Sequence, residues 1–259
     1  MEYYMTDERI TEYLKALENE ERAAATIEKY RRALLSFAAF LSGAAVTPEM
    51  IRLWKDDLRE KNYAPSTINA CLAALNGFFR FCGWTDCRAR FLKIQRRLFR
   101  DSKQELTRAE YKRLVAAAEA AGDHGLALLM ETICSTGIRV SEVQYITVEA
   151  AQRGRTEISL KGKIRTILLP GKLCRKLLKY ARKHKTVSGE IFLTRNGTSL
   201  SRRQIWTELK RLCKSAGVES AKVFPHNLRH LFATIFYRAC KDICLLYTSP
   251  SPRDRTRSR

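Results

Sequence analysis

Two stretches of the chain stand out, PHNLRHLFAT at residues 225–234 and TGIRVSEV at residues 136–143. In the first, His226 and Arg229 are three residues apart, and in the second Arg139 and Glu142 have the same spacing. Residues three apart share a face of a helix. Either pattern alone occurs often by chance, and Arg139 with Glu142 alone would most simply be an ion pair at a helix start. Both together, in this order, are far more specific.

The sequence between these stretches has the pattern of a β-hairpin. Residues 156–160 and 165–169 are short β-type runs, and they flank the basic segment Lys161-Gly162-Lys163-Ile164. A glycine-containing connection between two such runs predicts an antiparallel hairpin with a basic tip. Either lysine could instead be a solubilising residue of an exposed turn.

The charge of the chain narrows the class of partner. The 259 residues include 48 Lys and Arg against 27 Asp and Glu, a net charge of +21 at pH 7 that is spread along the whole sequence. Such a charge repels itself unless a polyanion is present, and nucleic acid is the commonest one; the alternative is a basic protein without a special partner. The eight cysteines form no C-x-x-C pair, which argues against a zinc site. No apolar run approaches membrane-spanning length.

Apolar periodicity divides the chain into regions. Residues 1–87 repeat apolar side chains at helical spacing, which predicts a small helical bundle. Residues 88–103 are rich in Lys and Arg with few turn formers, and we expect a linker there. This linker either follows a phosphate backbone or forms a solvated helix face. Residues 104–242 combine helical patterns with the hairpin. The fold class that follows is mostly α, with a bundle and a mixed α/β domain that contains a small antiparallel sheet.

Two finer expectations concern this mixed domain. The segment Glu190–Leu193 is a candidate further strand. Ser201 and Gln204 form a capping box that opens an amphipathic helix, and Ile205 and Trp206 are expected on its buried face.

The ordered set of Arg139, a hairpin lysine and His226-x-x-Arg229 resembles the pattern of the tyrosine recombinase (phage integrase) family, of Xer-like or mobile-element type. The resemblance covers nearly the whole chain. It implies a SAM-like core-binding domain in residues 1–87 and a catalytic domain, here incomplete, in residues 104–242. It also implies that Arg139 is the first catalytic arginine and that Lys161, preferred over Lys163, is the hairpin lysine.

The same resemblance implies that His226 and Arg229 are the family's H-x-x-R pair, and that Glu142 supports the first arginine. The reaction that this resemblance implies is phosphoryl transfer from DNA to a protein hydroxyl and back, through a 3′-phosphotyrosine. Arginines suit it because their forked donors stay charged at any working pH. A lysine or histidine can exchange protons with the leaving and attacking oxygens. No metal or cofactor is implied.

The sequence departs from the family pattern at its end. A nucleophilic tyrosine is expected on the order of thirty residues past Arg229, after a second His or Trp. Tyr237 and Tyr247 both come too early for that position. Residues 243–259 resemble a translated sequencing adapter, so we expect a disordered artefact there and a truncated, cleavage-deficient fragment that still binds DNA.

Further contacts with duplex DNA are expected from polar and basic residues at helix starts, in the linker and at the hairpin, with surface solvation as the alternative. These residues are Thr67, Asn69, Arg96, Arg97, Arg100, Lys103, Lys163, Arg202 and Arg203. The resemblance further implies a synaptic tetramer for the full-length parent, and a bacterial cytoplasmic or phage-associated location without membrane. The rival hypothesis is a non-catalytic DNA-binding protein that keeps the recombinase fold. The presence of Arg139, Lys161, His226 and Arg229 together favours the enzyme.

Overall fold

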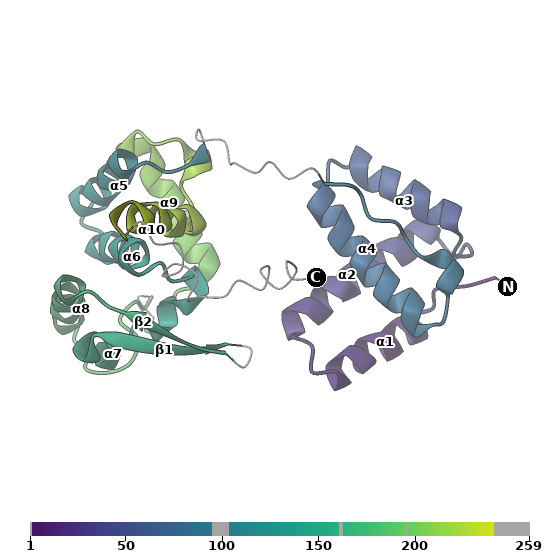
Figure 1. The fold of residues 1–259 in the computed structure, drawn as a ribbon, viewed down its shortest axis with the longest axis horizontal. Helices are drawn as coiled ribbons and strands as arrows, with labels where there is room; N and C mark the ends of the chain where they lie inside the picture. Colours follow the sequence, from purple (N-terminus) through teal and green to yellow (C-terminus); the bar gives the residue numbers. More distant parts are fainter. Residues whose placement is uncertain (1, 95–103, 161–162, 195, 241–259) are drawn as a thin grey trace. The chain divides into compact units, whose positions relative to one another are not determined.

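The computed structural model describes residues 2–94, 104–160, 163–194 and 196–240. The chain divides into two compact units, Met1–Leu98 and Phe99–Arg259 (Figure 1). Each unit has its own hydrophobic core. The division falls inside the segment predicted to be a linker. No helix among the described residues combines the length and the apolar character needed to cross a membrane.

The amino-terminal unit is a bundle of helices around an aromatic core. Its helices are α1 (Asp7–Asn19), α2 (Ala24–Leu41), α3 (Pro48–Glu60) and α4 (Pro65–Phe81), followed by the short 3-10 turn η1 (Thr85–Cys87). Phe37 of α2 lies 5.0 Å from Trp54 of α3, measured between ring centroids, and both are fully buried. Phe78 and Phe79 of α4 complete this core. Large aromatic side chains dominate the apolar surface that such a small bundle buries.

The segment after η1 runs back along α4 (Figure 1). The side-chain amide of Asn76 accepts from the backbone N–H of Ala89 at 2.8 Å and donates to its carbonyl at 3.0 Å. Asn69, two turns earlier on α4, makes the same pair of bonds to Leu92, at 2.7 and 2.9 Å. The first half of the predicted linker is therefore held against α4. Both polar groups of Asn69 take part in these bonds, which gives the side chain a structural role, and its expected DNA contact stays a prediction.

The carboxy-terminal unit confirms the mostly helical fold with a small antiparallel sheet. Strand β1 (Arg155–Leu160) pairs with β2 (Lys163–Leu168), in a register that runs from Arg155 opposite Leu168 to Leu160 opposite Lys163. The other elements are α5 (Arg108–Ala120), α6 (His124–Thr136), η3 (Val140–Tyr145), α7 (Val148–Arg153), α8 (Gly171–Lys183), α9 (Arg202–Ala216), η4 (Ser220–Lys222) and α10 (Pro225–Cys240).

Two expectations for this unit are wrong. Glu190–Leu193 makes only the isolated bridges Thr147–Glu190 and Leu193–Ser199 instead of a further strand. Trp206 is 49% exposed, with Lys210 Nζ 5.2 Å from its ring centroid. The reason is helical geometry, since α9 buries residues three and four apart, beginning with Ile205, and Trp206 lies about 100° round the helix from that position.

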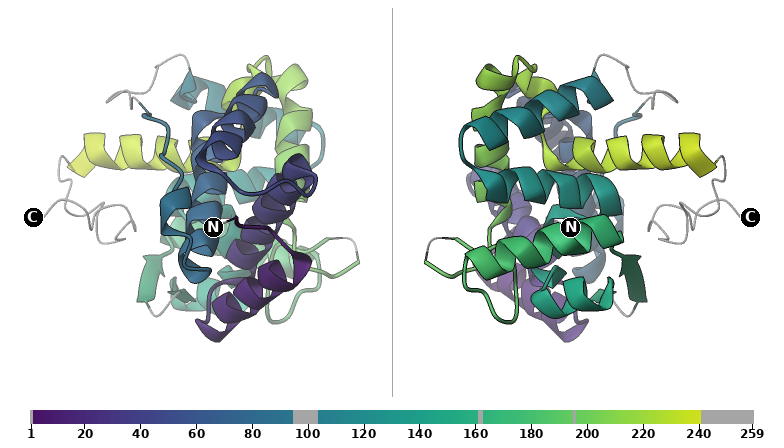
Figure 2. Two further views of the ribbon diagram at one scale, coloured as in Figure 1. Left: turned by 90° about the vertical axis from the view of Figure 1, so that its right-hand side faces the viewer. Right: turned by 90° about the vertical axis from the view of Figure 1, so that its left-hand side faces the viewer.

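Helix α10 is anchored at its first half only. Leu228 and Leu231 are buried against the core of the unit, where α10 packs on α6. From Ile235 onward the described side chains are exposed or partly exposed, and this half of the helix extends beyond the other helices of the unit (Figure 2). The H-x-x-R motif lies in the anchored half, where packing can fix its position.

The two asparagines of α4 predict a selective change in hydrogen exchange. Asn69→Ala removes the acceptor of the Leu92 amide, so this amide should exchange roughly 5- to 150-fold faster, the equivalent of losing about 1–3 kcal/mol of local protection. The Ala89 amide should keep its protection because Asn76 is intact. Asn76→Ala should give the reciprocal pattern. Equal loss at both amides in either variant would show that the clamps do not act separately.

Candidate active site

The site begins at the end of α6, where Gly137 makes the turn that the motif needs. Its φ of +63° lies in the left-handed region that glycine adopts without strain. A Cβ at this position would meet the Phe232 ring of α10 far inside van der Waals contact. The Gly137 carbonyl accepts a hydrogen bond from Arg229 Nη1. Gly137 thus allows α10 to approach the loop that carries Arg139.

The Glu142 carboxylate fixes Arg139 twice. One oxygen, Oε2, accepts from the Arg139 backbone N–H at 2.8 Å, and Oε1 accepts from Arg139 Nη1 at 2.8 Å. The Glu142 side chain is 1% exposed, whereas that of Arg139 is 45% exposed. A buried carboxylate must be paired, so it holds the arginine strongly in one orientation. The exposed part of the guanidinium remains accessible to an anionic ligand.

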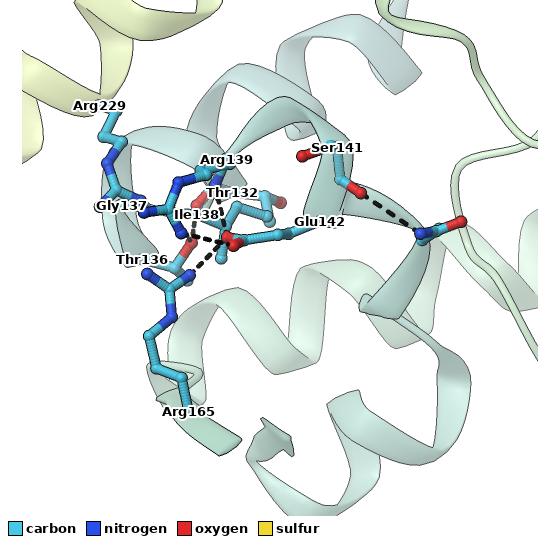
Figure 3. A network of polar contacts seen from close by, with 10 residues as sticks. Thr132, Thr136, Gly137, Ile138, Arg139, Ser141, Glu142, Arg165 and Arg229 are labelled. Carbon is cyan, nitrogen blue, oxygen red and sulfur yellow. Dashed lines mark hydrogen bonds and ion pairs between the residues drawn. The ribbon is translucent and has the colours of Figure 1, made fainter. Parts of the chain in front are cut away.

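Arg229 joins this group from α10. The guanidinium groups of Arg139, Arg165 and Arg229 gather beside the Glu142 carboxylate (Figure 3). Burial lowers the pKa of Arg229, and the positive charges of Arg139 and Arg165 lower it further, against the opposing effect of Glu142. Arginine stays protonated despite such a shift. The arrangement is therefore a concentration of positive charge with forked donors, suited to the oxygens of a phosphate.

Asn227 anchors the first turn of α10. Its side-chain amide donates to the carbonyls of Gln104 and Lys222, each at 2.8 Å, and it is almost fully buried. Lys222 in turn pairs with Glu110 of α5 at 2.9 Å. These contacts fix the turn on which His226 lies exposed, three residues before Arg229. The His226 ring packs edge-on against His230, with centroids 4.4 Å apart.

The other residues predicted from the sequence differ in position. Lys161 follows β1 in the sequence and is outside the described residues. The linker residues Arg96, Arg97, Arg100 and Lys103 are also outside them. The backbone of Lys163 is described as part of β2, but its side chain is not. Thr67 is exposed in the first turn of α4 in the amino-terminal unit. Arg202 and Arg203 are exposed in the first turn of α9, which the Ser201–Gln204 capping box opens as expected.

Arg165 is absent from the residues predicted from the sequence. It lies on β2, and its Nη2 donates to Glu142 Oε2. The available signal was strand parity, because Arg165 is two residues from Ile167, which is buried, and so shares its face. An arginine on the inner face of a strand requires a buried partner.

Comparison with known proteins gives matches over both units. Residues 104–246 match the model of the phage integrase family, and residues 10–85 match the phage integrase N-terminal SAM-like domain. The chain is 30% identical over 241 residues to tyrosine recombinase XerA of Pyrococcus furiosus, covering 89% of this chain and 80% of that protein. It is 28% identical over 270 residues to tyrosine recombinase XerC of Roseiflexus castenholzii, covering 92% and 82%.

Solved structures share the fold. A lambda integrase dimer bound to a COC′ core site matches with a TM-score of 0.78 at 18% identity, covering 99% of this chain and 80% of that one. The Tn1549 transposon integrase in complex with transposon right end DNA matches with a TM-score of 0.71 at 17% identity, covering 92% and 89%. At these identities the likeness concerns the fold alone.

The close approach at Gly137 predicts an unequal pair of glycine variants. Gly137→Ala should cost about 1–2 kcal/mol for the left-handed conformation and about 1–3 kcal/mol more for the overlap with Phe232. Gly154 has a similar φ of +70°, but a Cβ there would lie 4.0 Å from its nearest neighbour, the Leu169 carbonyl oxygen. Gly154→Ala should therefore show the conformational cost only. Urea unfolding of both variants measures the difference. Equal destabilisation would contradict the packing argument.

Proposed function

Because the chain belongs to the phage integrase family of tyrosine recombinases, we propose that it binds duplex DNA and holds a phosphodiester between Arg139 and Arg229 for strand exchange. The carrying observation is the juxtaposition of these two arginines, which come from the loop after α6 and from α10. The net charge of +21 supports a polyanionic partner. The lambda and Tn1549 integrases with this fold are complexes with DNA.

The two arginines supply the electrostatic part of the reaction. A tyrosine oxygen attacks phosphorus, the bond from phosphorus to the 5′ oxygen breaks, and negative charge develops on the non-bridging oxygens. Guanidinium groups held by Glu142 and by the Gly137 carbonyl are oriented before the charge develops, which is the condition for strong stabilisation. In this proposal Lys161 protonates the leaving 5′ oxygen, and His226 exchanges the proton of the attacking hydroxyl.

The tyrosines described in the carboxy-terminal unit do not fit the role of nucleophile. Tyr111 and Tyr145 are partly buried against the core of the unit, and burial raises the pKa of Tyr111. Tyr180 packs between His184 and Phe192. Tyr237 is 45% exposed on α10, but its position is about 12 Å along the helix from Arg229. We therefore propose that the described residues position and stabilise the phosphate without supplying the nucleophile.

Assembly on DNA is part of the proposal. A lambda integrase tetramer bound to a Holliday junction has the same fold, with a TM-score of 0.74 at 20% identity. Strand exchange between two duplexes needs more than one active site, because strands of both duplexes must be broken and rejoined. We propose that this protein acts as such an oligomer.

A substrate with its own leaving group tests the arginine site without a tyrosine. A duplex is selected from a random pool by its affinity for the chain. One strand of this duplex is then nicked, with a 3′-p-nitrophenyl phosphate on one side of the nick and a free 5′ hydroxyl on the other. A series of such duplexes places the nick at each position in turn. Attack by the hydroxyl joins the strand and releases p-nitrophenolate. Arg139→Ala and Arg229→Ala should each slow joining roughly 100- to 1000-fold.

Arg153→Ala is the matched control, because Arg153 is an exposed arginine of α7 in the same unit. Its joining rate should stay within about twofold of the parent rate, since it lies outside the arginine group. Joining by the alanine variants at the parent rate would contradict the proposed site. DNA binding without any joining by the parent chain would favour the non-catalytic alternative.

A nicked duplex tests the proposal about the nucleophile. Loss of the fragment downstream of the cleavage point makes cleavage irreversible, so a competent tyrosine accumulates as a denaturant-resistant adduct. The chain should bind this duplex and form no adduct. An adduct that disappears in Tyr237→Phe would contradict the proposal, and one that disappears in Tyr247→Phe would identify a nucleophile outside the described residues.

A further inference from the structure

Around Arg165, strand β2 exposes two apolar side chains and buries most of a charged one. The side chains of Ile164 and Leu168 are exposed, whereas Ile167 is buried and the Arg165 side chain is only 19% exposed. Side chains alternate between the faces of a strand, so Arg165 points to the same face as Ile167. Placing an arginine on the inner face costs desolvation free energy unless a buried anion compensates for it.

Glu142 is that anion, and it is shared. Its carboxylate accepts from the Arg139 backbone, from Arg139 Nη1 and from Arg165 Nη2. Oε2 receives both the Arg139 backbone N–H and Arg165, while Oε1 receives the Arg139 guanidinium. A carboxylate held by donors on both oxygens has little rotational freedom. Arg165 therefore helps to determine the direction in which Oε1 points.

Arg165 also acts on the second arginine by charge. Its positive charge lowers the pKa of Arg229, as that of Arg139 does. Three guanidinium groups next to one carboxylate leave an excess of positive charge, which an incoming phosphate reduces. Arg165 is less exposed than Arg139, and its Nη2 donates to the carboxylate.

We propose that Arg165 is a positioning residue that acts on Arg139 through Glu142. It ties the carboxylate to β2, so that Oε1 holds the Arg139 guanidinium in the orientation that receives the phosphate. This inference rests on the proposed function for its effect on rate, but the orientation of Arg139 is a separate, measurable property. A misplacement of about 1 Å at a reacting centre can cost about 100-fold in rate.

The orientation is tested by NMR of the full chain with ¹⁵N-labelled arginine. The Nε–Hε signal of Arg139 is assigned by its loss in Arg139→Lys. Arg165→Gln should shift or broaden this signal. Arg155→Gln, an exposed arginine at the start of β1, should leave it unchanged. An unmoved Arg139 signal in Arg165→Gln would overturn the proposal, whether or not the chain joins DNA strands.

The joining assay with the p-nitrophenyl ester then measures the consequence. Arg165→Gln should slow joining on the order of 10- to 100-fold, and Arg165→Lys should recover part of the rate because it restores the charge. If Arg165 acts through Glu142, the double variant with Glu142→Gln should be no slower than Glu142→Gln alone. A purely structural contribution would add to the effect of Glu142→Gln.

These outcomes separate the two proposals. Multiplying losses in the double variant, or a parent rate in Arg165→Gln, would overturn the role of Arg165 and leave the proposed function standing. Absence of joining by the unsubstituted chain would contradict the proposed function. The Arg139 Nε–Hε signal in Arg165→Gln would still decide whether Arg165 positions Arg139. Arg165→Lys covers the case in which Arg165→Gln does not fold.

Discussion

The burial of one carboxylate determines how the candidate site is built. Glu142 has left water almost completely, and an unpaired charge there would cost several kcal/mol. The local backbone and Arg139 supply part of the compensation, and Arg165 supplies another part from a strand that comes later in the chain. Because the buried Glu142 carboxylate is stable only with these donors in place, its desolvation keeps the Arg139 guanidinium in one orientation. Preorganisation of this kind is what a charge-stabilising site requires.

The second arginine depends on packing instead of on an ion pair. Arg229 contacts the Gly137 carbonyl only because α10 comes close to the end of α6, and this approach depends on a glycine opposite Phe232. Asn227 holds the beginning of the same helix by two backbone carbonyls. One guanidinium is thus oriented by charge and the other by helix packing. Their mutual repulsion is a cost in the free protein, and a bound phosphate would reduce it.

Sequence alone predicted the parts of the site that depend on short spacings. The relations of Arg139 to Glu142 and of His226 to Arg229 are local, as are the caps and the hairpin, so helical and strand periodicity were sufficient. Arg165 was missed because its partner lies 23 positions away and only strand parity marked its inner face.

Asn69 is a second case of the same difficulty. Its helix position was predicted, but its partner belongs to a segment with no regular structure of its own, and nothing in the pattern announced the clamp on Leu92. Both misses concern pairings that form only when distant segments pack.

The most direct test of the proposed phosphate site replaces each phosphate of the selected duplex in turn by a neutral methylphosphonate and measures the affinity of the chain for the duplex. One position should weaken binding far more than its neighbours, and Arg139→Ala with Arg229→Ala should abolish that difference. A uniform profile, or one that persists in the double variant, would contradict the phosphate site.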